Sequence, residues 1–328
     1  MRAARCLALG PVDDLVVVDV PDPVPGPRDV LIEIEAAGVN FPDALLVQGR
    51  YQVVLEPPFT PGSELAGRVL AVGPDVGDGG PAVGDRVYAS MFFGAFAERA
   101  VVDAAAVRVV PDGVEAGAAA AFGVTYVTAY HALHTVARVQ PDEWVVVLGA
   151  GGGVGMAAVD LAKAAGARVV AAASSPAKLE ACTAAGADVV VDYSQGDLKA
   201  AIREATGGTD VVIDPVGGSY TEPATRTLRP GGRLVVVGFA SGTIPALPLN
   251  LVLLKGITVQ GVDLRQLLSS DPELPGRAMG ELLAMLADGR LSPHVHATYA
   301  LDDVVEALRV VTDRQVIGKV LVAPGSAR

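Results

Sequence analysis

The chain of 328 residues is long enough for two domains, and its 51% apolar and 19% charged residues exclude a wholly disordered protein. A net charge of -12 argues against nucleic acid as a partner, because phosphate binding requires a basic surface. Two cysteines cannot form a disulfide framework in a chain of this size, which favours a reducing compartment.

The sequence gives no sign of export or of membrane insertion. Pro11 and Asp13 interrupt the first apolar run too early for a secretory signal. The most apolar stretch, residues 116–130, contains Gly117 and Gly123 and is too short to span a bilayer. We therefore expect a cytoplasmic protein that has no membrane partner.

The first 120 residues or so contain short apolar runs separated by proline and glycine. Frequent turn signals between short β-branched runs are typical of a compact, strand-rich, barrel-like domain. The runs that we predict as strands are residues 30–36, 66–72, 86–89 and 96–102.

From Trp144 the pattern becomes strand then helix, repeated along the chain. The predicted strands are residues 144–148, 167–173, 188–193, 210–214, 233–239 and 257–262. The predicted helices follow the glycines after residue 148, begin at Ser175-Pro176, and span 197–206 and 222–228. Near-continuous apolar strands that alternate with helices predict an α/β fold with a doubly wound parallel sheet covered on both faces.

The tail carries a predicted helix at 273–287, a strand at 295–299, a helix at 302–312 and a strand at 319–322. These elements are too few to form a domain alone, so we expect them to return to the N-terminal domain. The predicted organisation is a discontinuous catalytic domain, residues 1–122 with 265–328, and a dinucleotide-binding domain, residues 123–264.

A glycine cluster separates the first strand of this α/β series from its helix. Gly149, Gly152 and Gly155 recur at a spacing of three, with Gly153 and Val154 between the last two. Between a strand and a helix, bare backbone permits a tight turn and the close approach of a pyrophosphate to the helix N-terminus. The cluster therefore predicts a dinucleotide-binding loop, with a plain tight turn as the alternative.

The cofactor is selected after the second strand of a dinucleotide fold, where an acidic residue would bind the adenine ribose. Residues 171–178 contain no acid but do contain Ser174 and Lys178. A lysine there can form a charge-assisted hydrogen bond with a 2′-phosphate, worth about 1.5–3 kcal/mol. The segment favours NADPH over NADH, and the alternative for Lys178 is a solvated lysine on a helix face.

Zinc catalysis requires cysteine, histidine or carboxylate ligands, and the sequence supplies few of them. His131 and His134 share one helix face, and His294 and His296 alternate along a strand, with no cysteine near either pair. A four-cysteine structural site is impossible with two cysteines. We expect no metal.

These features resemble the zinc-independent quinone oxidoreductase branch of the medium-chain dehydrogenase/reductase superfamily, the zeta-crystallin-like proteins. The likeness covers almost the whole chain. Its landmarks are residues 37–43, 49–51, 61–67, 84–87, 123–129, 149–155, 186–188, 214–218, 230–233 and 318–320. The resemblance implies a GroES-like catalytic domain beside the Rossmann domain. Zinc-using relatives carry a cysteine where this chain has Asn40 and a histidine where it has Ser63.

The resemblance also implies roles for individual residues. Asn40 and Tyr51 are expected to face the nicotinamide and the substrate. The residues expected to bind the cofactor are Thr125, Gly149, Gly152, Gly153, Val154, Gly155, Ser174, Lys178, Tyr193, Phe239 and Arg314. The alternatives are a turn residue at Asn40, a loop cap at Tyr51 and a strand-end aromatic at Tyr193. For Asp43 and Glu64 we prefer a structural hydrogen-bonding role.

The expected reaction is hydride transfer from NADPH to a quinone or another conjugated carbonyl compound. Catalysis would depend on positioning and on hydrogen-bond donors at the developing oxyanion, with Asn40 and Tyr51 as candidates. Residues 91–96 offer apolar walls, although core packing is the favoured role. The alternatives are an enoyl-thioester or enone reductase and a non-catalytic NADPH-binding protein. The resemblance implies a homodimer, for which the sheet edge at 257–262 is a candidate.

Overall fold

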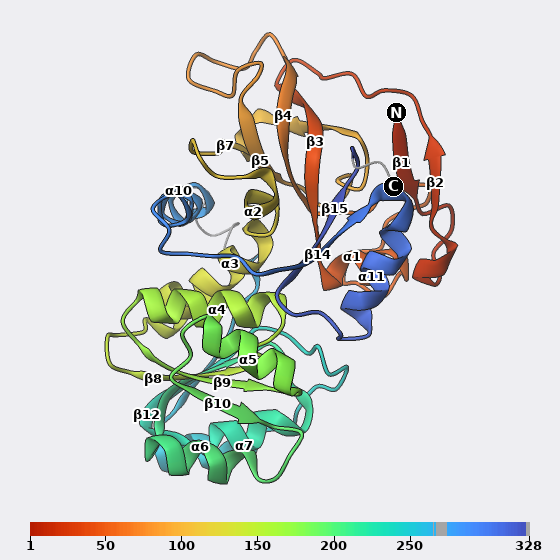
Figure 1. Cartoon of the computed structure of the whole chain (residues 1–328). Helices are drawn as coiled ribbons and strands as arrows, with labels where there is room; N and C mark the ends of the chain where they lie inside the picture. Colours follow the sequence, from red (N-terminus) through yellow and green to blue (C-terminus); the bar gives the residue numbers. More distant parts are fainter. Residues whose placement is uncertain (265, 267–273, 326–328) are drawn as a thin grey trace. The chain divides into compact units, whose positions relative to one another are not determined.

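The computed structural model describes residues 1–264, 266 and 274–325. The chain divides into two compact units (Figure 1). The first unit comprises Met1–Val124 and Pro293–Arg328, and the second comprises Thr125–Ser292. No described helix is long and apolar enough to cross a membrane.

The second unit is built on a six-stranded sheet in the order β10-β9-β8-β11-β12-β13. All neighbouring strands are parallel. The strands are β8 (Trp144–Leu148), β9 (Arg168–Ala173), β10 (Val189–Asp192), β11 (Thr209–Asp214), β12 (Leu228–Val236) and β13 (Thr258–Gly261). Counted from β8, this is the strand order 3-2-1-4-5-6 of a doubly wound dinucleotide fold, which confirms the predicted fold class.

Helices cover both faces of this sheet. The helices α4 (Gly153–Ala164) and α5 (Pro176–Ala184) lie over one face, and α6 (Leu198–Thr206) and α7 (Thr221–Thr225) lie over the other (Figure 1). The strands β8 and β9 are apolar almost throughout because both faces are buried. Further helices in the described part of the chain are α3 (Gly123–Tyr130), the π-helix η3 (His131–Ala137), η4 (Gly218–Tyr220), α8 (Leu249–Lys255) and α10 (Leu274–Ala287).

The first unit contains a seven-stranded sheet in the order β14-β15-β3-β4-β5-β7, with β6 also paired to β3. A separate two-stranded sheet pairs β1 (Arg2–Arg5) with β2 (Val16–Asp19). The other strands are β3 (Asp29–Val39), β4 (Glu64–Val72), β5 (Arg86–Ser90), β6 (Arg99–Asp103), β7 (Val107–Val109), β14 (Val295–Ala300) and β15 (Lys319–Ala323). The helical segments are η1 (Val12–Asp14), α1 (Phe41–Val47), η2 (Ala104–Ala106), α2 (Ala116–Ala120), η5 (Leu301–Asp303) and α11 (Val304–Thr312).

The end of the chain belongs partly to each unit. β15 pairs antiparallel with β3, with Val320 opposite Val39, so the last strand joins the first unit. α10 belongs to the second unit, whereas we predicted it in the first. Its Glu281 accepts a hydrogen bond of 2.6 Å from the hydroxyl of Tyr130, a residue of the same unit. The unit boundaries at Val124 and Ser292 thus differ from the predicted 122 and 264, and residues 265 and 267–273 lie outside the described part.

Two predicted elements have different limits in the structure. The strand predicted at 233–239 ends at Val236, so Phe239 lies in the following loop. The helix predicted at 222–228 is the single turn α7, and Leu228 begins β12. Periodicity alone cannot fix such limits, because a short apolar run fits a helix end and a strand start equally well.

Candidate functional site

The glycine loop between β8 and α4 is partly exposed backbone at the N-terminus of α4. Gly149 has a φ of 60°, which favours glycine, and its carbonyl accepts from the Gly152 N–H at 2.9 Å. A Cβ on Gly155 would lie 2.2 Å from the Gly149 carbonyl oxygen, so no side chain fits there. Gly152, Gly153 and Val154 are partly exposed at the start of α4. Free N–H groups and the positive helix end make this loop suited to a pyrophosphate.

The second strand of the sheet leads directly to the predicted 2′-phosphate residues. β9 ends at Ala173, Ser174 is exposed, and Ser175 caps α5 by accepting from the Lys178 N–H at 3.4 Å. The lysine stem lies against the glycine loop, since a Cβ on Gly151 would come within 2.7 Å of Lys178 Cβ and Cγ. The structure therefore brings Lys178 next to the glycine loop, a neighbourhood that the sequence pattern did not reveal.

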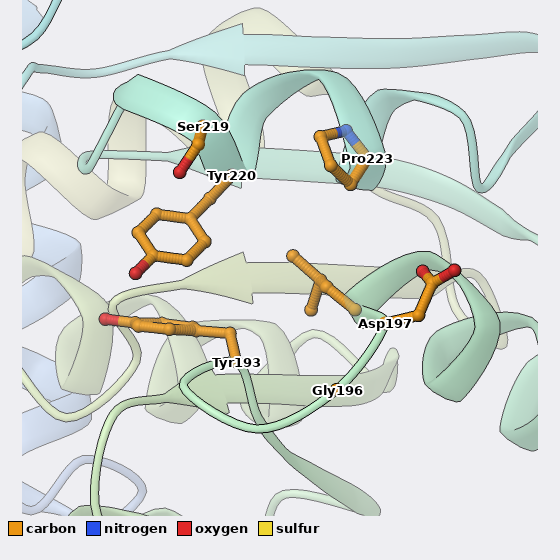
Figure 2. Close-up of a pocket in the computed structure, with 7 residues that line it drawn as sticks. Tyr193, Gly196, Asp197, Ser219, Tyr220 and Pro223 are labelled. Carbon is orange, nitrogen blue, oxygen red and sulfur yellow. The ribbon is translucent and has the colours of Figure 1, made fainter.

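Tyr193 lies at the same edge of the sheet. Its N–H donates to the Ala173 carbonyl at 3.1 Å, which places it beside the end of β9. Its ring packs on that of Tyr220, with centroids 4.4 Å apart and an angle of 41° between the planes. Figure 2 shows the two rings facing each other at one end of a hollow of about 400 Å³. The residues that line it are Tyr193, Gly196, Asp197, Leu198, Ser219, Tyr220 and Pro223.

Both tyrosines also pack against the buried core between the sheet and α6, so each has a structural role. Tyr220 is not among the residues predicted from the sequence. The signal available was its position two residues after the turn that ends at Gly218, because loops at the carboxyl ends of parallel strands form the binding edge of such a sheet.

The turn after β11 supports the loop that carries Phe239. The Asp214 carboxylate accepts from the N–H groups of Val216 and Gly217 and from the Thr221 hydroxyl, at 2.9, 2.8 and 2.6 Å. Gly217 has a φ of 70°, and a Cβ there would lie 2.9 Å from Phe239 Cδ1. The Phe239 side chain is 42% exposed, so this predicted residue remains accessible.

The two other predicted cofactor residues belong to different units. Thr125 is buried in α3 at the start of the second unit, with 5% exposure. Arg314 is exposed in the first unit, with a φ of 59° just after α11.

In the first unit, Asn40 lies at the centre of a buried polar network. It caps α1, and its N–H donates to Asp43 Oδ2 at 2.7 Å. Its amide nitrogen donates to Glu64 Oε1 at 2.8 Å and to the Ser63 hydroxyl at 3.2 Å. Its amide oxygen accepts from the Lys319 ammonium at 2.5 Å. Because these contacts use both amide hydrogens, the Asn40 side chain keeps none for a substrate oxygen.

Lys319 and Glu64 form the charged part of this network. The ammonium lies 2.6 Å from Glu64 Oε1, and the two side chains are 4% and 0% exposed. The second carboxylate oxygen accepts from the Val124 N–H at 2.7 Å. A Cβ on Gly38 would lie 2.5 Å from Glu64 Oε1, so glycine at that position leaves room for the carboxylate. Glu64 thus has the structural hydrogen-bonding role that we prefer from the sequence.

Lys319 lies in the family landmark at residues 318–320, but no role was predicted for it from the sequence. The signal was a lysine at the start of an apolar strand, Lys319–Ala323. A fully buried lysine requires a charged or polar partner, and Glu64 and Asn40 are those partners.

Asp43 is the second buried carboxylate of the network. Its side chain is 0% exposed, and its Oδ1 has no hydrogen-bond partner among the described residues. Burial raises the pKa of Asp43 to about 7, although the Asn40 N–H, the Ser63 hydroxyl and the Lys319 charge lower it. The Glu64 charge adds to the increase.

An aromatic surface adjoins Tyr51 in the same unit. The Tyr51 ring lies 6.3 Å from Phe92, which lies 6.4 Å from Phe93. Phe92 and Phe93 are 40% and 43% exposed, whereas Phe96 is fully buried. Core packing, the role favoured from the sequence, therefore describes Phe96, while Phe92 and Phe93 offer apolar surface.

The histidines and cysteines do not assemble into a metal cluster among the described residues. Cys6 and Cys182 are both buried. The Nδ1 atom of His131 lies 2.9 Å from the Thr135 hydroxyl, and the His134 ring packs 4.7 Å from the Tyr130 ring. Burial lowers the pKa of both histidines, so both favour the neutral form.

Two family models match the chain. Residues 26–112 match the alcohol dehydrogenase GroES-like domain, and residues 153–279 match the model described as zinc-binding dehydrogenase. Among curated relatives, quinone oxidoreductase-like protein 2 of Bos taurus is 39% identical over 98% of this chain and 92% of its own. The synaptic vesicle membrane protein VAT-1 homolog of Homo sapiens is 32% identical over 98% of this chain and 86% of its own.

Solved structures that resemble this chain include quinone oxidoreductases as well. The Escherichia coli quinone oxidoreductase complexed with NADPH superposes with a TM-score of 0.90 at 28% identity, covering 99% of this chain and 100% of its own. The quinone oxidoreductase of Thermus thermophilus, also solved as a complex with NADPH, has a TM-score of 0.84 at 34% identity, covering 98% and 100%. These likenesses confirm the predicted resemblance and the GroES-like and Rossmann folds. The chain therefore belongs to the quinone oxidoreductase-like family of medium-chain dehydrogenase/reductases.

Proposed function

We propose that this protein is an NADPH-dependent reductase that transfers hydride to a quinone or another conjugated carbonyl compound. The observation that carries the proposal is the position of the Lys178 stem over Gly151, which sets a lysine beside a partly exposed glycine loop at the N-terminus of α4. Such a loop binds a pyrophosphate, and a neighbouring lysine favours a dinucleotide with an extra phosphate.

NADPH fits the residues present at this edge of the sheet. Gly152, Gly153 and Val154 would bind the pyrophosphate, and Ser174, Lys178 and Tyr193 would surround the 2′-phosphate. No acidic residue lies between Ala171 and Lys178 to repel that phosphate or to select NADH. When bound, NADPH supplies the hydride. The NADPH complexes of the two bacterial quinone oxidoreductases support this choice.

A flat, apolar acceptor suits the aromatic surface of the first unit. Phe92 and Phe93 expose apolar area beside Tyr51, whose hydroxyl would donate a hydrogen bond to the acceptor oxygen. Quinones are electron-poor, so accurate positioning with few polar contacts is sufficient for their reduction. The names of the relatives support a quinone as the acceptor class.

We also propose that the reaction requires no zinc. The amide of Asn40 and the hydroxyl of Ser63 are weak ligands compared with the cysteine and histidine of zinc-using relatives. The Lys319 ammonium binds both the Asn40 amide oxygen and the Glu64 carboxylate, so it already neutralises the Glu64 charge in this network.

The test is an acceptor panel assayed with NADPH before and after treatment with EDTA. The panel contains naphthoquinones, benzoquinones, alkenals and an enoyl-thioester, and NADPH oxidation is followed by absorbance. We expect quinone turnover that EDTA leaves unchanged. Turnover that is lost on chelation and restored by Zn²⁺ would overturn the metal-free reaction. If alkenals or the enoyl-thioester are reduced faster than the quinones, one of them is the substrate class in place of a quinone. If NADPH binds but no acceptor is reduced, the protein is non-catalytic.

We further propose a homodimer formed through the outer edge of β13. All four residues of this edge strand are exposed. The adjacent α8 exposes Leu249, Leu253 and Leu254 by 77%, 80% and 78%. Exposed apolar residues beside the edge strand of a sheet are typical of an interface.

Light scattering after size exclusion should give twice the 33.3 kDa mass of the chain. Replacing Val259 with proline at this edge should give a monomer, because proline cannot donate the pairing hydrogen bond. The matched control is Val190→Pro in β10, at the opposite edge of the sheet, which should leave the dimer intact. A wild-type monomer, or a dimer that persists in the Val259 variant, would contradict this interface.

A further inference from the structure

Tyr193 and Tyr220 form an aromatic pair at the edge of the sheet that the proposed cofactor would occupy. β10 pairs with β9 so that Asp192 lies opposite Ala173, and the Tyr193 N–H donates to the Ala173 carbonyl at 3.1 Å. Tyr193 therefore lies beside Ser174, the residue that follows β9. Its ring lies 4.4 Å from that of Tyr220, with an angle of 41° between the planes. The pair joins a predicted 2′-phosphate residue to a residue that has no assigned role.

The backbones that carry the two rings differ in their support. Tyr193 leads into residues 194–197, which are all exposed. Tyr220 ends η4, and the Asp214 carboxylate closes the turn before it by accepting from two backbone N–H groups. The same carboxylate accepts at 2.6 Å from the hydroxyl of Thr221, the residue after Tyr220. Since exposed loops have few packing contacts, the Tyr193 side chain depends on the ring beside it more than Tyr220 does.

Stacking on Tyr220 selects one orientation of the Tyr193 side chain. A tyrosine has three staggered χ1 wells, and the two centroids lie at the close end of the range in which aromatic rings attract. Figure 2 shows the two hydroxyls at the same end of the pair, away from Asp197 and Pro223. The stacked ring therefore keeps the Tyr193 hydroxyl at that end.

We propose that Tyr220 is a positioning residue for the 2′-phosphate of NADPH, and that it acts by holding the Tyr193 side chain beside Ser174. This role rests on the proposed function, because it requires NADPH as the cofactor and Tyr193 as a contact of its phosphate. A side chain that is already ordered loses less conformational entropy when a ligand binds. Tyr220 therefore raises the affinity for NADPH and does not alter the affinity for NADH, which lacks the phosphate.

Core packing is the competing role of Tyr220. Both rings pack against the buried apolar residues between the sheet and α6. A ring with that role alone would lower the free energy of unfolding when it is removed. It would not alter the Kd of NADPH relative to that of NADH, so the two roles predict different binding.

The first test measures the Tyr193 side chain in the cofactor-free protein by NMR. The chain has seven tyrosines, and the spectrum of tyrosine-labelled Tyr193→Phe identifies the signals of Tyr193. Three-bond couplings to the ring carbon Cγ should report a single χ1 rotamer in the wild type and in Tyr220→Phe, which retains the ring. Tyr220→Leu should give couplings averaged over rotamers. A single rotamer in Tyr220→Leu would overturn the positioning role.

The second test is the Kd of NADPH and of NADH, measured by fluorescence titration. Tyr220→Leu should raise the Kd of NADPH roughly 2- to 13-fold, the range expected for immobilising one side chain on binding, and should leave the Kd of NADH unchanged. Tyr220→Phe should bind both cofactors as the wild type does. An equal loss in Tyr220→Phe and Tyr220→Leu would show that the hydroxyl, not the stacked ring, is required, which contradicts the proposal.

The matched control is Tyr299→Leu, which removes a partly buried ring that packs on the core of the first unit. This variant should lower the free energy of unfolding, as Tyr220→Leu does, but should change neither Kd. A selective rise in the Kd of NADPH in this control would show that loss of packing alone weakens binding of the phosphate.

Combining the substitutions tests whether Tyr220 acts through Tyr193. Tyr193→Phe removes the hydroxyl and should itself raise the Kd of NADPH. The double variant, Tyr193→Phe with Tyr220→Leu, should have the same Kd as Tyr193→Phe, because no hydroxyl remains to be positioned. Additive losses would give Tyr220 an effect independent of Tyr193 and overturn the proposal.

These outcomes separate the positioning role from the proposed function. A wild-type protein that binds NADPH and NADH equally overturns the proposed cofactor and the positioning role together. A wild-type preference for NADPH that persists unchanged in Tyr220→Leu, or in Tyr193→Phe, overturns the positioning role alone. Thermal unfolding shows that each variant is folded at the temperature of the titration.

Discussion

One buried ion pair holds the polar network around Asn40, at the start of α1. Lys319 and Glu64 are 2.6 Å apart and almost completely buried, so each requires the other. Removing one member of a buried pair leaves an uncompensated charge, which costs about 3–5 kcal/mol. The orientation of the Asn40 amide depends on the same pair, because its oxygen accepts from Lys319 and its nitrogen donates to Glu64.

Lys319→Met should therefore lower the free energy of unfolding by about 3–5 kcal/mol, measured by urea denaturation near neutral pH. The double variant Lys319→Met with Glu64→Gln should recover part of this loss, because no charge remains buried alone. Lys163→Met breaks an ion pair with Asp188 whose side chains are 31% and 35% exposed, and should cost at most about 1 kcal/mol. Equal losses in the two lysine variants would contradict the assigned role of Lys319.

In the proposed function, cofactor choice depends on Lys178. Lys178→Met retains an apolar stem over Gly151 but removes the ammonium. Loss of a charge-assisted hydrogen bond of about 1.5–3 kcal/mol should raise the Kd of NADPH by roughly 10- to 150-fold. The Kd of NADH should change little, since that cofactor lacks the phosphate. Fluorescence titration measures both constants, and an equal loss for the two cofactors would exclude a contact with the 2′-phosphate.

At the scale of elements, the Asp43 carboxyl at the start of α1 should make the free energy of unfolding depend on pH. Asp43 accepts from the Asn40 N–H at the start of α1, and its pKa is about 7 in the folded chain against an ordinary value of 3.8. The folded state therefore binds a proton more tightly than the unfolded state does. The contribution of this group to stability is complete below pH 3.8 and is lost as pH rises through about 7.

Relative to Asp43→Asn, the wild-type protein should lose up to roughly 4 kcal/mol of stability between about pH 4 and about pH 8, from about 1.4 kcal/mol for each pKa unit. Thermal unfolding of both proteins across this range measures the difference. Parallel stability curves for the two proteins would show that Asp43 titrates at its ordinary pKa.

The order and type of the elements in the second unit could be predicted because two periodicities alternate there. β8 and β9 are almost entirely apolar, which is typical of parallel strands buried on both faces. The limits of β12 and α7 could not be predicted, because they depend on strand pairing rather than on local pattern. The unit to which α10 belongs could not be predicted either, because contacts such as the hydrogen bond between Tyr130 and Glu281 join residues far apart in sequence.

At the scale of the whole molecule, the sequence predicted the family, the fold class and the glycine loop. These features are carried by spacing and by residue type. The remaining parts of the site are contacts between residues distant in sequence: Lys178 with Gly151, Tyr193 with Tyr220, and Lys319 with Asn40. A single sequence cannot show such contacts, because they arise only when β-strands and loops assemble.

The inability of a single sequence to show such contacts also explains why the predicted role of the Asn40 amide does not agree with its hydrogen bonds. The family resemblance implied that its amide faces a substrate, and the residue type allows that role. The structure shows both amide hydrogens engaged by Ser63 and Glu64. Hydrogen-bond saturation is a property of the folded neighbourhood, so it changes the chemistry available without changing the motif.

The central claim is that the edge of the sheet at Ser174 and Lys178 selects a phosphorylated nicotinamide dinucleotide for hydride transfer. The most direct measurement is the ratio of kcat/KM for NADPH to that for NADH, with one naphthoquinone as the acceptor. A lysine contact with the 2′-phosphate predicts a ratio of roughly 10 to 150 in favour of NADPH. A ratio near one, or a preference for NADH, would contradict the account.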